Sequence, residues 1–238
     1  MTPTTTRWCK DINMWTIDRP INDIKDTDGS VLVYGSCSPH KTEFCSISCY
    51  NVKLYKMFKG MAKKDIRNEK FWQSLPTNKN DNQDSLKALQ QKLFRSRRQT
   101  KRARLMSRGE AIKDMSDVFR IKTLCEATPD TVWWVPTRAW RDEGLKQLIQ
   151  DVLFPLKNIS LNASLDPTNT EQEEQMLKDS GWNTMYFGDD KQTTSKVGDR
   201  RYLCPKTHKK IKICDTCKGG CFSQVTLGKQ SNVHLSQH

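Results

Sequence analysis

The fold class is decided by the stretch TVWWVPTRAWRDEGLKQLIQDVLFPLKNISLNASLD, residues 131–166. Its first segment, TVWWVPT (131–137), is a short apolar run of β-branched and aromatic residues, which is typical of a buried strand. Residues 144–153 then repeat leucine, isoleucine and valine at helical spacing, and NISLNASLD (158–166) alternates like a second strand. A strand, a helix and a strand in this order predict a parallel sheet covered by helices.

The same alternation continues on both sides of this stretch. On the amino-terminal side, SVLVYGS (30–36) predicts a buried strand and RARLMS (102–107) predicts another. On the carboxyl-terminal side, a helix over residues 171–180 starts with acids and stops at a glycine, and TMYFGD (184–189) predicts a further strand. A complete (β/α)8 barrel takes about 250 residues. The chain of 238 residues therefore predicts an α/β fold with an incomplete (β/α) barrel.

Nine cysteines are the most informative residues outside this pattern. No window holds the roughly 18 unbroken apolar residues of a membrane span, and the start MTPTTTRWCKDINMW lacks the apolar core of a signal peptide. We therefore expect a cytoplasmic protein without membrane contact, in which clustered cysteines bind metal or act in catalysis instead of forming disulfides. Seven of the nine form two groups: Cys37, Cys45 and Cys49, and then Cys204, Cys214, Cys217 and Cys221.

The first group lies in CSPHKTEFCSISCYN (37–51) and has the pattern C-x7-C-x3-C. A structural zinc site takes four closed ligands, whereas an iron–sulfur cluster held by three thiolates leaves one iron open to a substrate or cofactor. Three thiols therefore favour an open iron–sulfur cluster. Two alternatives remain, a Cys3His zinc site that uses His40 and thiols that bind no metal.

The second group has the pattern C-x9-C-x2-C-x3-C within CPKTHKKIKICDTCKGGC (204–221). Four cysteines with a CxxC core and a Gly-Gly turn can close around one zinc ion or a second iron–sulfur cluster. Five lysines lie in this segment, and their charge would offset the negative charge of four thiolates on a divalent ion. The same lysines could instead meet phosphates.

The chain is strongly basic, with 40 Lys and Arg against 27 Asp and Glu and a net charge of +13. Such a charge attracts polyanions, so a nucleic acid or a nucleotide is the expected partner or substrate. Residues 53–67 alternate lysines with apolar residues at helical spacing, which predicts a basic amphipathic helix. The run RSRRQTKRAR (95–104) concentrates the charge further, with a solvated cationic surface as its alternative reading. Its candidate phosphate contacts are Arg97, Arg98, Lys101 and Arg102.

Taken together, these motifs resemble a known family. The chain is similar to the phage gene-product-88-like proteins in CSPHKTEFCSISCYN, SRGE, TVWWVPTRAW, NISLNASLD and the terminal CP…CxxCxxxC, over roughly residues 31–221. That family is related to phage three-cysteine proteins of the radical S-adenosylmethionine (SAM) type. The resemblance implies an N-terminal extension (1–29), a radical-SAM-like partial α/β barrel (30–200) and a C-terminal four-cysteine metal-binding segment (201–238).

The resemblance also implies roles for individual residues. The three thiols of the first group would hold a [4Fe-4S] cluster whose fourth iron binds the amine and carboxylate of SAM. Gly109 and Glu110 would match the family's glycine–acid element, with Glu110 accepting a hydrogen bond from the SAM amine. Tyr50 would lie beside the cluster or the adenine. The ends of later strands would bring to the same pocket Thr137, Arg138, Asn162, Ser164 and Asp166.

These expectations support more than one function. The first is a phage radical-SAM-like enzyme in the host cytoplasm, which acts on a nucleic acid or nucleotide. The second is a non-catalytic, zinc-stabilised phage protein that binds nucleic acid or is directed at the host, as the charge and the four-cysteine group suggest. A third is a regulator that carries an iron–sulfur cluster.

Overall fold

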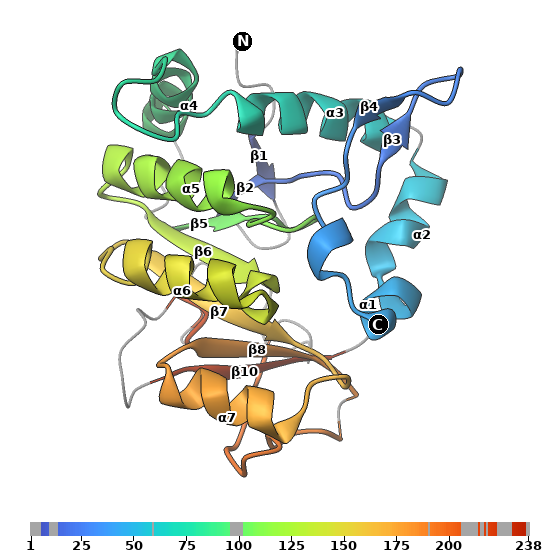
Figure 1. Cartoon of the computed structure of the whole chain (residues 1–238), viewed down its shortest axis with the longest axis vertical. Coiled ribbons are helices and arrows are strands. Elements are labelled where there is room, and N and C mark those ends of the chain that lie inside the picture. The colour runs from blue at the N-terminus through green and yellow to red at the C-terminus, as the bar shows by residue number, and fades with distance from the viewer. Residues whose placement is uncertain are drawn as a thin grey trace.

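The computed structural model describes residues 6–9, 14–58, 60–95, 102–189, 191–205, 214, 217, 219–222 and 230–236. Its main element is one eight-stranded sheet (Figure 1). In spatial order the strands are β1 (Thr6–Cys9), β2 (Met14–Ile17), β5 (Arg102–Leu105), β6 (Val132–Thr137), β7 (Ile159–Leu165), β8 (Asn183–Gly188), β10 (Asn232–Ser236) and β9 (Tyr202–Leu203).

Seven of these strands run parallel, and only β1 is antiparallel to its neighbour β2. The two outermost strands, β1 and β9, do not pair with each other, so the described part of the chain forms an open sheet and not a closed barrel. The prediction of a parallel α/β sheet is therefore confirmed. The main sheet also takes strands from outside residues 30–200, since β2 lies before that range and β10 after it.

Helices connect the parallel strands and are fixed by caps that are visible in the sequence. Asp114 and Asp142 accept hydrogen bonds at the starts of α5 and α6, and Thr170 forms a capping box with Glu173 at the start of α7. The helices are α1 (Glu43–Ser48), α2 (Tyr50–Met57), α3 (Gly60–Gln73), α4 (Asp84–Arg95), α5 (Met115–Ala127), α6 (Glu143–Val152) and α7 (Glu171–Asp179). Short 3-10 helices cover Ser38–His40 and Ala139–Arg141.

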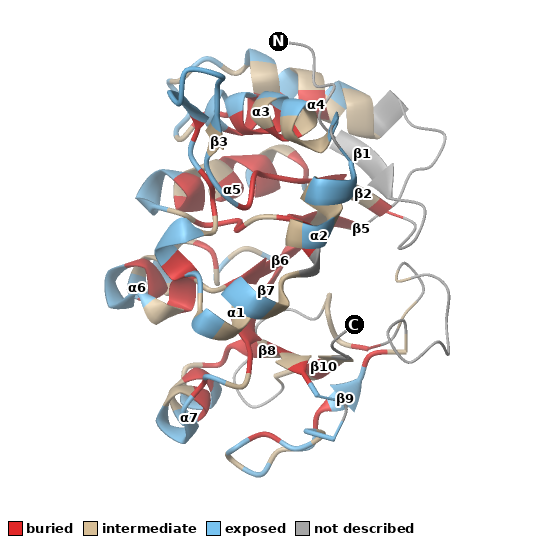
Figure 2. Cartoon of the chain, turned by 90° about the vertical axis from the view of Figure 1, so that its right-hand side faces the viewer, coloured by how far each residue is buried: buried red, intermediate tan, exposed pale blue. Residues whose placement is uncertain are grey.

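The hydrophobic core lies between the sheet and helices α5, α6 and α7, which cover one face (Figure 2). Leu161 and Ala163 of β7 point into this core, and Ser160 and Asn162 alternate with them toward the opposite face. We call that opposite face the open face. Indole rings fill much of the core, and the largest are Trp72, Trp133, Trp140 and Trp182.

The predicted buried strand over residues 30–36 is wrong in its placement. Residues Val31–Val33 form β4, which pairs only with β3 (Ile24–Lys25) in a separate two-stranded hairpin, and Leu32 is 43% exposed. The strand that lies beside β5 is β2 instead. An apolar run predicts a strand but does not say which strand it pairs with, and the Asp-Gly turn before β4 folds it back onto β3.

The basic amphipathic helix predicted over residues 53–67 is divided into α2 and α3. Helix α4 follows a polar stretch and was not predicted. Among the described residues, no helix is long and apolar enough to cross a membrane.

Candidate metal and cofactor site

The first cysteine group lies on the loop that connects β4 to α2, at the carboxyl ends of the parallel strands (Figure 1). Cys37 precedes a 3-10 turn, Cys45 lies in α1, and Cys49 forms the N-cap of α2. All three line one cavity of about 160 Å³, together with Gly109 and Glu110. The chain thus brings the three thiols and the glycine–acid element to one place.

A polar clamp fixes the cysteine loop to the end of β7. The Thr42 hydroxyl accepts a hydrogen bond from the Cys45 N–H (3.0 Å), which caps α1, and donates one to the Asp166 carboxylate (2.7 Å). Arg138 lies 3.6 Å from the same carboxylate. Burial alone would raise the pKa of Asp166, but hydrogen bonds from Thr168 and Thr42 and the charge of Arg138 lower it. Asp166 therefore holds the loop as a carboxylate.

The three thiols differ in acidity because their surroundings differ. Burial raises the pKa of Cys37 to about 12, and the nearby charge of Glu110 adds to this effect. Cys45 donates a hydrogen bond to the sulfur of Cys49, which raises the pKa of Cys45 and lowers that of Cys49 to about 6. Three partly buried sulfurs this close together oppose one another's ionisation, because each thiolate raises the pKa of its neighbours.

Gly109 allows the loop after β5 to approach the cysteine loop. Its φ is +82°, and a Cβ atom there would lie 2.6 Å from the Ser36 hydroxyl and 2.7 Å from the Arg19 carbonyl oxygen. The close approach lets the Glu110 N–H donate to the Ser36 hydroxyl (2.8 Å), directly before Cys37. A glycine is required here for both conformation and space.

Glu110 joins the ends of two strands. One carboxylate oxygen accepts from the N–H groups of Ala111 (2.9 Å) and Ile112 (3.2 Å), and the other accepts from the Arg138 N–H (2.9 Å). The residue is buried and lines the cavity. A carboxylate has about four acceptor positions, so roughly one remains for a donor inside the cavity.

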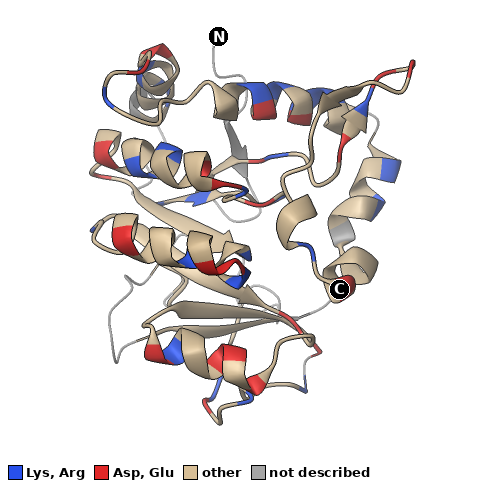
Figure 3. Cartoon of the chain, in the orientation of Figure 1, with Lys and Arg blue, Asp and Glu red and all other residues tan. Residues whose placement is uncertain are grey.

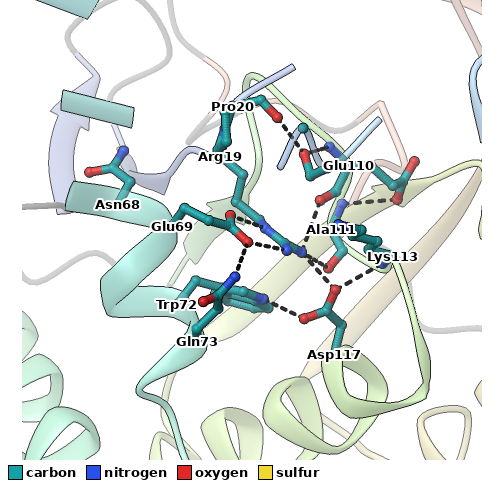
Figure 4. Close-up of polar contacts among 12 residues, drawn as sticks. Arg19, Pro20, Asn68, Glu69, Trp72, Gln73, Glu110, Ala111, Lys113 and Asp117 are labelled. Carbon is teal, nitrogen blue, oxygen red and sulfur yellow. Dashed lines mark hydrogen bonds and ion pairs between the residues drawn. The ribbon is translucent and has the colours of Figure 1, made fainter. Parts of the chain in front are cut away.

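Behind Glu110 lies a buried arginine that holds the same loop from below (Figure 4). The Arg19 guanidinium pairs with both oxygens of Glu69 (2.7 Å each) and with Asp117 (2.7 Å). It also donates to the carbonyl oxygens of Glu110 (3.4 Å) and Ala111 (3.3 Å). Burial opposes the charged form, but the two carboxylates outweigh it and raise the pKa of Arg19.

A second buried arginine repeats this arrangement. Arg108 lies 2.8 Å from Asp65 of α3 and 3.3 Å from Asp18, which follows β2. Asp65 in turn accepts a hydrogen bond from the hydroxyl of Tyr55, on the helix that follows Cys49. Arg108 and its partners therefore connect α2 and α3 to the loop that carries Gly109.

The second cysteine group lies on the open face. Burial raises the pKa of Cys221 to about 12, and the nearby charges of Cys204, Cys214 and Cys217 add to this effect. The Gly219 N–H donates to the Cys217 sulfur (3.3 Å), and a Cβ at Gly219 would lie 3.2 Å from that sulfur. The absence of a side chain at Gly219 lets the backbone come within hydrogen-bonding distance of this sulfur.

The open face holds this segment through both ring and polar contacts. Phe222 packs against Trp134 (centroids 5.7 Å apart) and lies under the guanidinium of Arg102 (4.8 Å). The Cys221 carbonyl oxygen accepts from Ser160 (2.9 Å) and from Asn162 (3.3 Å).

The predicted site residues therefore separate into two places. Gly109, Glu110 and Arg138 line the cavity of the first cysteine group, and Asp166 clamps its loop. Asn162 and Arg102 contact the second cysteine segment instead. The side chain of Tyr50 lies outside the described residues, as do all of Arg97, Arg98 and Lys101.

Sequence reasoning missed two polar residues of the cavity. Asn51 is buried, lines the cavity and has no hydrogen-bond partner for its Oδ1 atom. Arg104 also lines it, with its guanidinium 4.3 Å above the Trp134 ring and its Nε without a partner. The position of Asn51 two residues after Cys49 was a usable signal, whereas Arg104 was hidden within a basic run.

A family model described as Gene product 88 matches residues 10–229, which is most of the chain. The chain belongs to the Gene product 88 family. No curated protein and no solved structure matched it. Both cysteine groups lie inside the part that matches the Gene product 88 model.

Proposed function

We propose that this Gene product 88 protein is an iron–sulfur protein of the radical SAM type, built on an incomplete (β/α) barrel. The observation that carries the proposal is the cavity at the carboxyl edge of the sheet, which three thiols from one loop line together with Gly109 and Glu110. Sites at this edge of a parallel sheet are the usual place for ligands in α/β proteins.

The residues fit an iron–sulfur cluster by the chemistry of their donors. Thiolates suit iron–sulfur clusters and zinc, and three of them leave one iron of a cubane available to an outside ligand. Within the described residues, neither cysteine group brings three His, Cys, Asp or Glu side chains close enough to hold a single metal ion as they are placed. A single zinc needs every sulfur about 2.3 Å from the metal, whereas a cubane spreads its thiolates over separate irons.

The protein's own groups supply the polar contacts for SAM. The remaining acceptor position of Glu110 and the unpartnered Oδ1 of Asn51 are available to an amine. Arg138 has an unpartnered Nε and is available to a carboxylate. The apolar part of the lining limits the contact of the cavity with water, and it includes Met106, Pro136, Leu165, Met185, Phe187 and Leu235.

When bound and reduced, the cluster supplies one electron to SAM, and the protein positions the reacting groups and keeps solvent away. The basic composition favours a nucleic acid or nucleotide as the substrate.

The four-cysteine group favours a second candidate, a non-catalytic protein that zinc stabilises and that binds nucleic acid or a host component. Its supporting observation is that Cys204, Cys214 and Cys217 lie close enough to Cys221 to raise the pKa of that thiol. Such a donor set suits one zinc ion as well as a second iron–sulfur cluster.

Anaerobic purification with iron, sulfide and zinc analysis separates the two candidates. We expect about four irons per chain from the first group, and a changed electron paramagnetic resonance spectrum when SAM is added to the reduced protein. Cys45→Ala should lose those irons, whereas the matched control Cys125→Ala, a buried core thiol, should keep them. Iron-free, zinc-replete wild type, or a spectrum that SAM leaves unchanged, would contradict the radical SAM proposal.

A further inference from the structure

Helices α2 and α3 sort their charges between the inside and the outside of the protein. Their only acids, Asp65 and Glu69, are both buried and paired with the internal arginines Arg108 and Arg19. Since neither acid reaches the surface, neither offsets the charge of the exposed lysines and arginine of these helices. The exposed charged side chains described on the two helices are all basic: Lys53, Lys56, Lys63, Arg67 and Lys70.

These five residues, which we call the basic stripe, follow the helical repeat. Lys63, Arg67 and Lys70 recur at spacings of four and three residues, so they share one side of α3. Lys53 lies on α2, four residues after Cys49 and therefore about 6 Å farther along the helix axis. Figure 3 shows these basic positions along α3 and α2, which follow each other toward the cysteine loop. The β3–β4 hairpin carries acids at its turn, Asp26 and Asp28, and directly before β3, Asp23.

Exposed apolar side chains interrupt the basic stripe where α2 meets α3. Met57, the last residue of α2, is 68% exposed, and Phe58, its C-cap, is 54% exposed. An aromatic ring between lysines is the arrangement with which proteins bind unpaired nucleic acid, because bases stack on the ring while phosphates meet the cations. A duplex keeps its bases stacked inside and gains little from such a ring.

We propose that the basic stripe binds the backbone of a single-stranded nucleic acid, with a base stacked on Phe58. This proposal deepens the proposed function. The binding of a strand by the basic stripe stands by itself, and only the delivery of a nucleotide to the cavity rests on the proposed function. The size of the cavity, about 160 Å³, agrees with an unpaired strand because a duplex cannot enter it. The residues of the 95–104 run that lie outside the described part of the chain are not needed for this surface.

Fluorescence anisotropy with a labelled oligonucleotide of about 20 bases, longer than the roughly 4–16 bases of typical single-strand sites, tests the surface. The triple variant Lys53→Gln/Lys63→Gln/Arg67→Gln should weaken single-strand binding at least tenfold. It should also reduce the salt slope by about 2, since each lost phosphate contact contributes about 0.7. The matched control, Lys87→Gln/Lys157→Gln/Lys191→Gln, removes the same charge from exposed sites elsewhere and should change the affinity less than threefold.

Phe58→Ala tests the stacking separately from the charge. We expect it to weaken single-strand binding about fivefold or more, from the stacking contribution of about 1 kcal/mol or above per base, and to leave duplex binding nearly unchanged. Equal losses in the two triple variants would overturn the proposed interface, because binding would then follow net charge alone. Tighter binding of duplex than of single strand, with no effect of Phe58→Ala, would overturn it as well.

The same measurements on Cys45→Ala keep this proposal separate from the iron–sulfur assignment. The basic stripe contains no cysteine, so this variant should bind the single strand like the wild type even without iron. Normal binding by an iron-free wild type would refute the cluster and leave the interface standing. A wild type that contains iron but binds no single strand at low salt would refute the interface and leave the cluster assignment standing.

Discussion

The two cysteine groups are held in place by different kinds of interaction. The first loop is fixed by polar contacts to regular elements, through Thr42 to Asp166 and through Ser36 to Glu110. The second segment has little regular structure among its described residues and lies on the open face through Phe222 and two accepting carbonyl groups. The comparison suggests that the first loop keeps its shape without a metal, whereas the second depends on one.

The largest expected effect is the loss of a thiol from the second group. Cys217→Ala should give insoluble or metal-depleted protein, because structural metal binding supplies about 10–16 kcal/mol, as much as the roughly 5–15 kcal/mol that stabilise a whole domain. Cys45→Ala in the first group is the matched control and should stay soluble. Soluble yield and metal content are the measurements. A well-folded Cys217→Ala protein with unchanged metal content would remove the distinction between the two groups.

A smaller but still large effect is expected at the buried arginine behind the first group. Arg19→Met keeps the volume but leaves Glu69 buried without its arginine and Asp117 with Arg120 as its remaining ion-pair partner, which should cost about 3–5 kcal/mol in the free energy of unfolding. The exposed pair of Lys122 and Glu126 provides the control, and Lys122→Ala should cost less than about 1 kcal/mol. Urea denaturation gives both values. If Arg19→Met costs no more than the control, polar contacts are not what fixes the first loop.

The smallest expected effect tests the clamp itself. Thr42→Val removes the cap of α1 and the bond to Asp166, and should cost about 1–2 kcal/mol. Thr168→Val is the matched control, because Thr168 donates to the same carboxylate but lies outside the cysteine loop. We expect Thr42→Val alone to speed the release of iron to a chelator. Equal release rates in the two variants would show that the clamp does not hold the metal loop.

The sequence predicted the regular part of the fold well because local rules decide it. Helical spacing placed α6, the acidic first turn and the closing glycine placed α7, and apolar runs placed β6 and β7. The error at residues 30–36 has a physical cause. An apolar run indicates a strand, but it does not indicate which strand pairs with it. The pairing depends on contacts between segments that are distant in sequence, here those of β2 with β5.

The candidate site was predictable only in part. The patterns of the first and second cysteine groups and the Gly109-Glu110 pair stand out in the sequence because such residues are rare or special in their spacing. Asn51 and Arg104 did not stand out, since Asn and Arg are ordinary surface residues until a fold buries them.

The sequence by itself determined the alternation of strands and helices over residues 131–189, the net charge and the two groups of thiols, because each depends on composition or on spacing within a short segment. Only the tertiary structure decided that the three thiols face Glu110 in one cavity, and that Asn162 turns toward the other group. It also decided that Asp65 and Glu69 of α3 pair with buried arginines, so that the exposed lysines and arginine of α2 and α3 keep their positive charge. The physical reason is that a charge is offset or left free by partners about 50 to 100 residues away in the chain, which no local pattern records.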